Sequence, residues 1–238
     1  MKIALIGYGK MGKAIEEIAF KRGHEIVLKI DINNLSEFTI ENLKHADAAI
    51  EFTGPHSAFE NVKKIIDSGI PVVCGSTGWT EKLEEINKIC KENNGSFIYA
   101  SNFSVGVNIF FEINKTLARI ISPHKEYKPI IEEIHHTQKK DAPSGTAITI
   151  AEQILEWNKN KKRWVNEMSE NSEDLEIISQ RIDPAPGTHS VKYSSAIDDI
   201  EIIHTAHNRK GFALGAVLAA EFTKNKKGFF SMKDVLHL

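Results

Sequence analysis

The chain of 238 residues has few cysteines, no long apolar run and no excess of either charge. It has two cysteines, Cys74 and Cys90, which are too few for a disulfide framework and lack the spacing of a zinc site. Its longest apolar run, residues 212–220, is far shorter than the ~20 residues of a membrane-spanning helix. Neither sign of charge dominates, since 30 basic and 32 acidic side chains give a formal net charge of −2. We therefore expect no nucleic-acid partner and no membrane association.

Internal repeats and low-complexity segments are also missing, and the first residues do not have the pattern of a signal peptide. The apolar run at residues 3–6 is too short, and a glycine-rich turn follows it instead of a small-residue cleavage site. We expect a cytoplasmic protein. A composition of 41% hydrophobic and 26% charged residues is ordinary for a globular protein, and the length suits one large domain or two modest ones.

The first hundred residues alternate strand-like and helix-like patterns. Short apolar segments predict strands at residues 2–6, 26–30, 48–52, 71–74 and 96–100. The spacing of apolar residues predicts helices at residues 10–21, 58–67 and 80–93. Strands that alternate with helices of this length imply βαβ units, so we predict an α/β fold with a Rossmann-type doubly wound parallel sheet.

The pattern changes after about residue 103. Here the sequence predicts helices at 108–121 and 146–157, strands at 129–136, 175–181, 188–194 and 199–206, and a charged loop at 159–174. These elements describe a second α+β domain built on a mixed or antiparallel sheet. Helical spacing returns at 211–222. We expect two domains, one of residues 1–104 and 209–238 and the other of residues 105–208.

A glycine-rich turn lies between the first predicted strand and the first predicted helix. It is a GxGxxG sequence made of Gly7, Tyr8, Gly9, Lys10, Met11 and Gly12. Its glycines allow a tight turn, close approach of a pyrophosphate and close packing of helix on strand. Asp31 follows about 20 residues later, where a carboxylate that binds the ribose hydroxyls is expected. This context favours a dinucleotide site over a purely structural turn.

Three features bear on how such a cofactor binds. Ile32, rather than an arginine, follows Asp31, which favours NADH over NADPH, although Lys10 and Lys29 are candidates to lie near a 2′-phosphate. Two further turns follow predicted strands at the edge where ligands of such sheets bind; they contain Gly75, Ser76 and Thr77, and Ser101, Asn102 and Phe103. Each is equally well an ordinary loop, but their shared position predicts contacts with the nicotinamide half of the cofactor.

The densest chemistry lies in residues 133–147, Glu-Ile-His-His-Thr-Gln-Lys-Lys-Asp-Ala-Pro-Ser-Gly-Thr-Ala. His135 and His136 point to opposite sides of an extended strand, so they make a poor pair of metal ligands and we expect no metal. Lys139 shares the face of His135 if the extension continues. A histidine and a tuned lysine suit proton transfer near neutral pH, whereas an isolated histidine is by default a hydrogen-bonded structural residue.

Further along, small and basic residues offer anion-binding groups. Ser144, Gly145 and Thr146 open the helix predicted at 146–157, where a hydroxyl caps the helix and the amide groups form a seat for a carboxylate or phosphate. Arg209 is either a bidentate partner for a second carboxylate or a solvated surface side chain.

At this point the sequence resembles a known family. Residues 135–147 are similar to the HHxxKxDxPSGTA signature of the 4-hydroxy-tetrahydrodipicolinate reductases, also called dihydrodipicolinate reductases, of bacterial and plant lysine and diaminopimelate synthesis. Phe52 and Thr53 resemble the FT after the family's buried strand, and residues 75–78 resemble its GTTG with Ser76 replacing the first threonine. Residues 100–108 are close to its nicotinamide-side segment, and residues 186–191 to its PGxHxV run.

The resemblance implies an oxidoreductase that uses NADH or NADPH to reduce 4-hydroxy-tetrahydrodipicolinate to tetrahydrodipicolinate with loss of water. It implies that His135 is the acid and that Lys139 is a second proton donor which also steadies the substrate. His136, Gly145 and Thr146 are then expected to bind the dicarboxylate, and Ser144 and Arg209 join them as candidates. Phe52, Thr53 and Ala100 are added to the expected cofactor contacts.

For the architecture, the resemblance implies a Rossmann domain that binds the dinucleotide and a mixed-sheet domain that binds substrate and forms a homotetramer. The segment 159–174 departs most from the family pattern. Two other functions stay open: a different two-domain nicotinamide dehydrogenase, which has no reason to carry residues 135–146 in this form, and a redox sensor that only binds NADH. The sensor would need a DNA-binding element or a basic face, and neither is visible.

Overall fold

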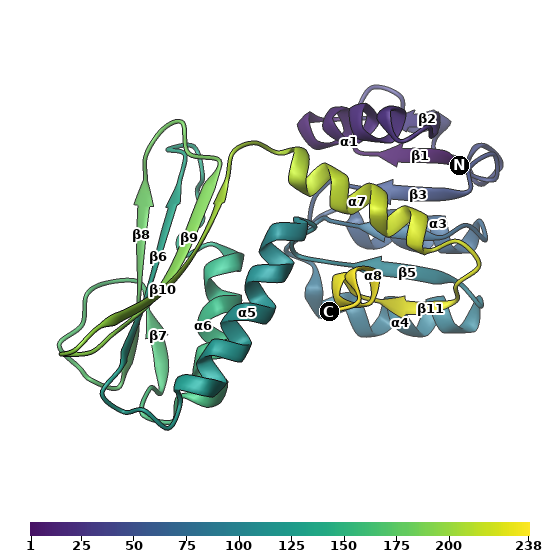
Figure 1. The fold of residues 1–238 in the computed structure, drawn as a ribbon. Coiled ribbons are helices and arrows are strands. Elements are labelled where there is room, and N and C mark those ends of the chain that lie inside the picture. The colour runs from purple at the N-terminus through teal and green to yellow at the C-terminus, as the bar shows by residue number, and fades with distance from the viewer. The chain divides into compact units, whose positions relative to one another are not determined.

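The computed structural model describes residues 1–238 and divides into two compact units. The first unit contains Met1–Val105 and Arg209–Leu238, and the second contains Gly106–Asn208. Figure 1 shows the helices and strands of both units, coloured along the chain. None of the helices combines the length and the apolar character that a bilayer crossing requires.

The first unit is built on a six-stranded sheet in the order β11-β5-β4-β3-β1-β2, with all neighbouring strands parallel. Its strands are β1 (Lys2–Ile6), β2 (Glu25–Ile30), β3 (Ala48–Glu51), β4 (Val72–Cys74), β5 (Ser96–Tyr99) and β11 (Gly228–Phe230). The chain moves outward from β1 to β2, then returns to lay β3 on the other side of β1. This order confirms the predicted doubly wound sheet, in which ligands bind at the carboxyl ends of the strands next to such a reversal.

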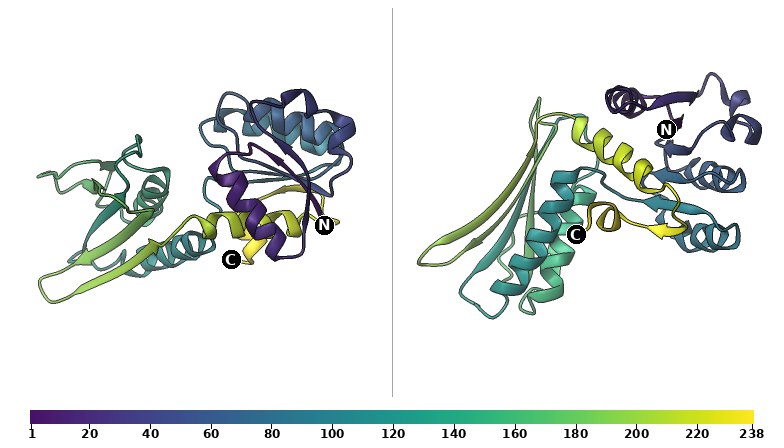
Figure 2. Two further views of the ribbon diagram at one scale, coloured as in Figure 1. Left: turned by 90° about the horizontal axis from the view of Figure 1, so that it is seen from above. Right: turned by 45° about the vertical axis from the view of Figure 1, so that its right-hand side comes forward.

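Helices cover both faces of this sheet because the side chains of its buried strands alternate between two apolar clusters. Ile3 and Leu5 of β1 pack with α1 (Lys10–Lys21), α7 (Lys210–Phe222) and α8 (Met232–Leu236). Ala4 and Ile6 face the opposite cluster, which includes α2 (Ile40–Leu43), α3 (Ala58–Asp67) and α4 (Leu83–Glu92). Figures 1 and 2 show α1 and α7 on one face and α3 and α4 on the other.

The sixth strand, β11, and the short helices α2 and α8 have no counterpart in the sequence predictions. β11 has three residues and pairs only with β5. Three residues are too few to show a periodic pattern, so only the tertiary pairing reveals it as a strand.

The second unit contains a five-stranded mixed sheet in the order β10-β9-β6-β8-β7. Its strands are β6 (Lys128–His135), β7 (Arg163–Val165), β8 (Asp174–Arg181), β9 (Gly187–Ser194) and β10 (Asp199–Ala206). β8 is parallel to β6 and β7, whereas β9 is antiparallel to β6 and β10. The predicted mixed sheet is therefore confirmed.

The prediction of a loop at residues 159–174 is wrong in part, because β7 lies inside it. β7 pairs with the start of β8, and Arg163 Nε lies 2.8 Å from Asp174 Oδ1 across that pair. The apolar residues Trp164 and Val165 form too short a run among lysines to have marked a strand.

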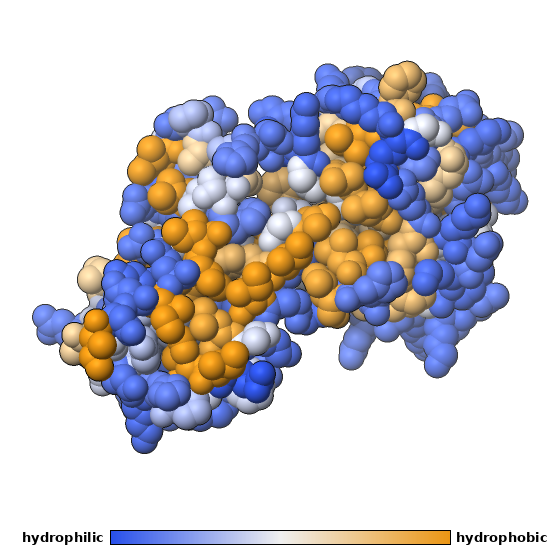
Figure 3. Space-filling view, in the orientation of Figure 1, coloured by the Kyte–Doolittle hydropathy of each residue, from blue (hydrophilic) through white to orange (hydrophobic).

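The two helices of this unit, α5 (Val105–Ile121) and α6 (Gly145–Trp157), share a buried cluster with the sheet. Residues of β6 alternate accordingly, since Ile131, Glu133 and His135 are buried while Glu132 is exposed. Helix α5 is also apolar on its outer side, and Figure 3 shows hydrophobic side chains gathered over it. Ile109, Ile113 and Ile120 there are 43%, 48% and 55% exposed.

Helix α7 approaches the chain after β5 so closely that one position excludes any side chain. A carbon added at Gly215 would lie 1.7 Å from the carbonyl oxygen of Phe103, which is backbone and cannot rotate away. At Gly211, by contrast, the nearest atom to such a carbon is Ser104 Oγ at 3.6 Å.

We predict that Gly215→Ala lowers the free energy of unfolding by at least about 2 kcal/mol, because the helix must move off the sheet. The matched variant Gly211→Ala is expected to raise it by up to about 1 kcal/mol, since alanine favours the helix and meets no clash. Urea unfolding followed by circular dichroism measures both. Equal stabilities of the two variants would contradict the close approach.

Candidate functional site

The glycine-rich turn joins β1 to α1 in the geometry that a pyrophosphate requires. The amide groups of Gly7 and Tyr8 both donate to Ile30 O at 2.9 Å, which ties the turn to the end of β2. Gly7 has φ +98°, and a side-chain carbon there would lie 2.2 Å from Phe52 O. At Gly12 it would lie 2.5 Å from Gly7 O. These two positions therefore require glycine for the turn and for helix–strand contact.

Gly9 differs from its neighbours because nothing lies within 4 Å of where its side chain would begin. It is the N-cap residue of α1, with no side-chain cap and no acidic residue in the first turn. Lys10 beside it is exposed, and Met11 is partly exposed. The backbone here faces open space at the positive end of a helix, which fits the phosphates of a dinucleotide.

Asp31 is fixed at the carboxyl end of β2, as the sequence predicted for a ribose-binding acid. Its Oδ1 accepts a hydrogen bond from Asn33 N at 2.7 Å, and its own amide donates to Asn34 Oδ1 at 2.8 Å. Lys29 lies 2.8 Å from Glu16, with its ammonium 5.0 Å from the centre of the Tyr8 ring. The charge of Lys29 is therefore already paired within the first unit.

The ends of β3, β4 and β5 meet at the same edge of the sheet. The ring of Phe52 occupies the space beside Gly75, where a side-chain carbon would lie 2.2 Å from it, and is 5.6 Å from the ring of Phe103. Thr53 N donates to Ser76 Oγ at 2.9 Å. The structure thus brings these five of the strand-end residues predicted to contact the cofactor together. The other predicted residues follow β4 and β5 in the chain; they are Thr77, Ala100, Ser101 and Asn102.

A buried carboxylate that the sequence reasoning did not identify, Glu51, supports this edge. It ends β3 with no exposed surface, and its Oε1 accepts from Thr53 N at 3.0 Å and from the Thr53 hydroxyl. Its Oε2 lies 3.0 Å from Cys74 Sγ. Burial, followed by the charge of Glu51, raises the pKa of the Cys74 thiol well above its usual value, so this cysteine stays protonated and unreactive.

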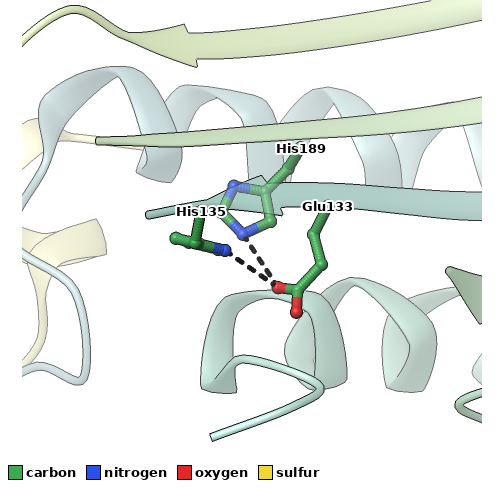
Figure 4. Close-up of side chains that lie close together, drawn as sticks. All are labelled: Glu133, His135 and His189. Carbon is green, nitrogen blue, oxygen red and sulfur yellow. Dashed lines mark ion pairs between the residues drawn. The ribbon is translucent and has the colours of Figure 1, made fainter. Parts of the chain in front are cut away.

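In the second unit, the histidine segment begins at the end of β6, between the neighbouring strands β8 and β9. The register places Ser179 of β8 and His189 of β9 on either side of Glu133, and Arg181 of β8 next to His135. Figure 4 shows that Glu133, His135 and His189 point toward one another. Neither His189 nor Arg181 was predicted as a site residue, because no sequence signal reveals which strands pair.

The Glu133 carboxylate is completely buried, and polar and basic neighbours stabilise its charge. Its Oε1 accepts from Ser179 Oγ at 2.8 Å, from Ser144 N at 3.1 Å and from Arg181 Nη2 at 3.2 Å. Burial alone would raise the pKa of Glu133, but interactions with His189, Ser144 and Ser179 outweigh it and hold the pKa well below its usual range. Glu133 is therefore an anion at neutral pH.

Both histidines face the other oxygen of this carboxylate. His135 Nδ1 lies 3.5 Å and His189 Nε2 lies 3.7 Å from Glu133 Oε2, as the dashed lines in Figure 4 indicate. Burial and then the charge of His189 lower the pKa of His135 to about 4, against the opposing effect of Glu133. His135 is therefore neutral at neutral pH in this structure.

The three side chains also have the composition of a metal site, since their ligand atoms all lie within 4.8 Å of one another. However, Glu133 already accepts hydrogen bonds from Ser144 and Ser179, and the guanidinium of Arg181 is 3.2 Å away. A fixed cation at that distance opposes a second one, so the geometry favours a polar network.

The chain turns after β6, so the condition under which Lys139 would share a strand face with His135 is not met. Lys139 N donates to His136 O at 3.1 Å, so the chain turns instead of continuing as a strand. Lys139 is still close enough for its charge to lower the pKa of His135. Its ammonium binds both oxygens of Asp141, at 2.9 and 2.8 Å, while Arg181 donates to the Lys139 and Asp141 carbonyls.

Helix α6 begins next to this network. Ser144 is its N-cap, and its hydroxyl accepts from Ala147 N at 3.2 Å, which confirms the predicted capping role. Gly145 is exposed with nothing within 4 Å of its side-chain position. His136 is partly buried, and Thr146 follows Gly145 in the first turn. Arg209 is exposed at the N-cap of α7 in the other unit, so its predicted contact with the substrate stays a prediction.

Comparisons with known proteins agree with this arrangement. The family model for the N-terminal part of dihydrodipicolinate reductase matches residues 1–103, and that for the C-terminal part matches residues 106–236. The chain belongs to the dihydrodipicolinate reductase family. Its activity is therefore the NADH- or NADPH-dependent reduction of 4-hydroxy-tetrahydrodipicolinate in lysine and diaminopimelate synthesis.

Individual relatives of this family match nearly the whole chain. The 4-hydroxy-tetrahydrodipicolinate reductase of Christiangramia forsetii is 52% identical, covering 99% of this chain and 98% of the relative. That of Methanoregula boonei is 33% identical, covering 100% and 98%. The fold is similar to a dipicolinate-bound dihydrodipicolinate reductase from Paenisporosarcina sp. TG-14, with a TM-score of 0.79 over 97% of both chains at 23% identity.

The depressed pKa of His135 predicts a pH-dependent stability. Between about pH 6.5 and 4 the unfolded chain binds a proton at His135 that the folded chain does not, so the free energy of unfolding falls as the pH falls through this window. The loss is on the order of 3 kcal/mol.

In His135→Gln this part of the pH dependence is expected to vanish, while His56→Gln, which changes an exposed histidine, should keep it. Urea unfolding at pH 7 and pH 4.5 gives the change in the free energy of unfolding with pH, which is compared between the variants. A His135→Gln slope equal to that of the wild type would show that the histidine titrates alike in both states.

Proposed function

We propose that the reductase activity is carried by His135, Lys139 and the start of α6 in the second unit, acting on a dicarboxylate ring. The observation that carries this proposal is the convergence of a titratable histidine and a helix N-terminus on one buried carboxylate, Glu133, with Lys139 close enough for its charge to act on His135. Bound dipicolinate in the relative from Paenisporosarcina sp. TG-14, an aromatic dicarboxylate, supports a seat for two carboxylates.

The first unit is proposed to hold the cofactor, which supplies the hydride when bound. Gly7, Gly9 and Gly12 let the backbone approach the pyrophosphate at the start of α1, with Tyr8, Lys10 and Met11 around it. Asp31 is placed to accept hydrogen bonds from the adenosine ribose. The strand-end residues are proposed to line the nicotinamide; they are Phe52, Thr53, Gly75, Ser76, Thr77, Ala100, Ser101, Asn102 and Phe103.

Cofactor preference is proposed to lean toward NADH. Asp31 repels a 2′-phosphate, and no arginine follows it. Lys29, a candidate partner for that phosphate, is paired with Glu16 at 2.8 Å. Lys10 remains as an exposed cation near the turn, so NADPH is expected to bind more weakly but still to bind.

The substrate is proposed to be held through both of its carboxylates. His136, Ser144, Gly145 and Thr146 surround the start of α6, where amide groups favour an anion. Lys139 contributes an ammonium, and Arg209 is proposed for the second carboxylate. Holding both ends of the ring fixes its orientation, which supplies the entropic part of the rate acceleration.

Proton delivery is proposed to depend on the substrate's charge. His135 is neutral before binding because burial and His189 lower its pKa to about 4. A dianion nearby would raise that pKa, since an opposite charge favours the protonated ring. His135, with Lys139 as second donor, then gives up one proton while the ring gains the hydride and the hydroxyl leaves as water.

The protein is proposed to be cytoplasmic. The sheet of the second unit is proposed to form the contact between subunits of a homotetramer. Its face away from α5 and α6 carries Ile130, Ile134, Ile178 and Ile203, of which Ile203 is 60% exposed. An open sheet face with this many branched apolar side chains is better buried against another copy than hydrated.

The activity is tested by loss of reduced-cofactor absorbance when the chain meets substrate freshly made from pyruvate and aspartate semialdehyde. We expect turnover with both cofactors and a lower KM for NADH. Binding of both cofactors without turnover would contradict the substrate assignment while leaving the dinucleotide site intact.

His135→Gln is expected to lower kcat by about 10²-fold or more, because general acid catalysis contributes that much, with NADH affinity unchanged. Steady-state kinetics and NADH fluorescence titration measure the two quantities. A comparable loss of NADH affinity would count against the role of an acid.

Ile203→Glu is expected to shift the assembly to smaller species in light scattering after gel filtration, because it places a charge on the sheet face. Phe20→Glu, which changes an exposed apolar residue of α1 in the first unit, is the control and should leave the mass unchanged. A monomeric wild type would refute the tetramer.

A further inference from the structure

The Glu133 carboxylate contacts His135 and the start of α6 directly, and it is linked to the loop of Lys139 through Arg181. Its Oε2 lies 3.5 Å from His135 Nδ1, and both of its oxygens accept from the amide of Ser144, the N-cap residue of α6. It also accepts from Arg181, whose guanidinium donates hydrogen bonds to the carbonyl oxygens of Lys139 and Asp141 as well. One buried anion thus links the acid, the anion seat and the lysine loop.

The two nitrogens of the His135 ring have different surroundings. Nδ1 is buried and has no hydrogen-bond partner of good geometry, and the Glu133 oxygen at 3.5 Å faces it. Nε2 faces Gly187, where a side-chain carbon would lie 3.1 Å away and where φ is +155°. A side chain at position 187 would therefore crowd Nε2 of His135, whereas Nδ1 of the same ring points to the Glu133 carboxylate.

We infer that Glu133 is a positioning residue that accepts the Nδ1 proton of His135 and so reserves Nε2 for proton transfer to the substrate. This inference rests on the proposed function, in which His135 is the acid. A ring whose Nδ1–H is bound by a carboxylate takes up its second proton at Nε2, on the side away from that carboxylate. Hydrogen bonds of this kind are often long before substrate binds and shorten in the complex.

The same carboxylate sets the distance between the acid and the anion seat. Ser144 N is 3.1 and 3.2 Å from its two oxygens, and Ser144 Oγ is 3.2 Å from His189 Nε2. Glu133 of β6 thus contacts both His135 and Ser144, the N-cap residue of α6. A shift of either would move the substrate's carboxylate relative to Nε2.

The charges around His135 explain why an anion is needed here. On β8 Arg181, on β9 His189 and in the following loop Lys139 face the ring, and Lys139 is paired with Asp141. Glu133 is the neighbour that favours the protonated ring. Without it, the remaining cations oppose protonation, so the fall of kcat toward alkaline pH should begin at a lower pH.

The first experiment is ¹⁵N NMR of the chain labelled at histidine, with the His135 signals identified by their loss in His135→Gln. At neutral pH we expect the wild-type ring to carry its proton on Nδ1, with Nε2 unprotonated. A ring protonated on Nε2 overturns the inference. This measurement needs no variant at Glu133 and no turnover.

The second experiment compares Glu133→Gln with Glu132→Gln, which changes the exposed neighbour on the opposite face of β6. We expect Glu133→Gln to lower kcat by about 10²-fold, to move the alkaline limb of the kcat profile to lower pH, and to leave NADH affinity unchanged. Glu132→Gln should match the wild type. Retention of kcat within threefold and an unmoved profile in Glu133→Gln overturns the inference.

A third variant, Glu133→Asp, keeps the charge and draws the oxygens back from the ring. It should recover the pH profile and part of kcat, and it decides the matter if Glu133→Gln does not fold. A wild type with the Nδ1 proton but no turnover overturns the proposed function and the role derived from it. Turnover with the proton on Nε2 overturns the positioning role alone.

Discussion

The second unit is organised around one buried charge, the carboxylate of Glu133. A buried carboxylate costs several kcal/mol unless it is paired and hydrogen-bonded, and here the strand register supplies the partners. Ser179 and His189 face it from the two neighbouring strands, Arg181 contacts it from two residues further along β8, and Ser144 contacts it from the N-cap of α6. The position of the histidine segment follows from this pairing.

The first unit depends on a constraint of a different kind, the absence of side chains at contact points. Gly7, Gly12 and Gly215 each allow backbone to approach backbone where a side-chain carbon would collide. Two of these contacts shape the turn that is proposed to face the dinucleotide, and the third allows α7 to pack closely against the chain after β5. The polar network of the second unit and the close backbone contacts of the first unit therefore have the same effect. Each fixes the positions of residues that are proposed to bind ligands.

Periodicity predicted most of the fold because long elements repeat their burial pattern many times. The strands β1 to β5 and the helices α1, α3, α4 and α7 of the first unit, and the long elements α5, α6, β8, β9 and β10 of the second, agree with the predicted elements. β7 and β11 have three residues each, too few to show a period, and they exist because a neighbouring strand offers hydrogen bonds. The sequence left open whether the chain stays extended after His136, because the turn there depends on the hydrogen bond from Lys139 N to His136 O and on the contact of Arg181 with the Lys139 carbonyl.

The sequence by itself determined the glycine-rich turn, Asp31 and the histidine segment, since each is a local pattern whose chemistry follows from residue types at fixed spacing. It could not indicate that His189 and Arg181 lie beside Glu133, because partners far apart in the chain meet only when strands pair in one register. The protonation of His135 was also decided by the tertiary structure. Its pKa depends on burial and on His189 and Arg181, which lie far from residue 135 in the sequence, as well as on the near neighbours Glu133 and Lys139.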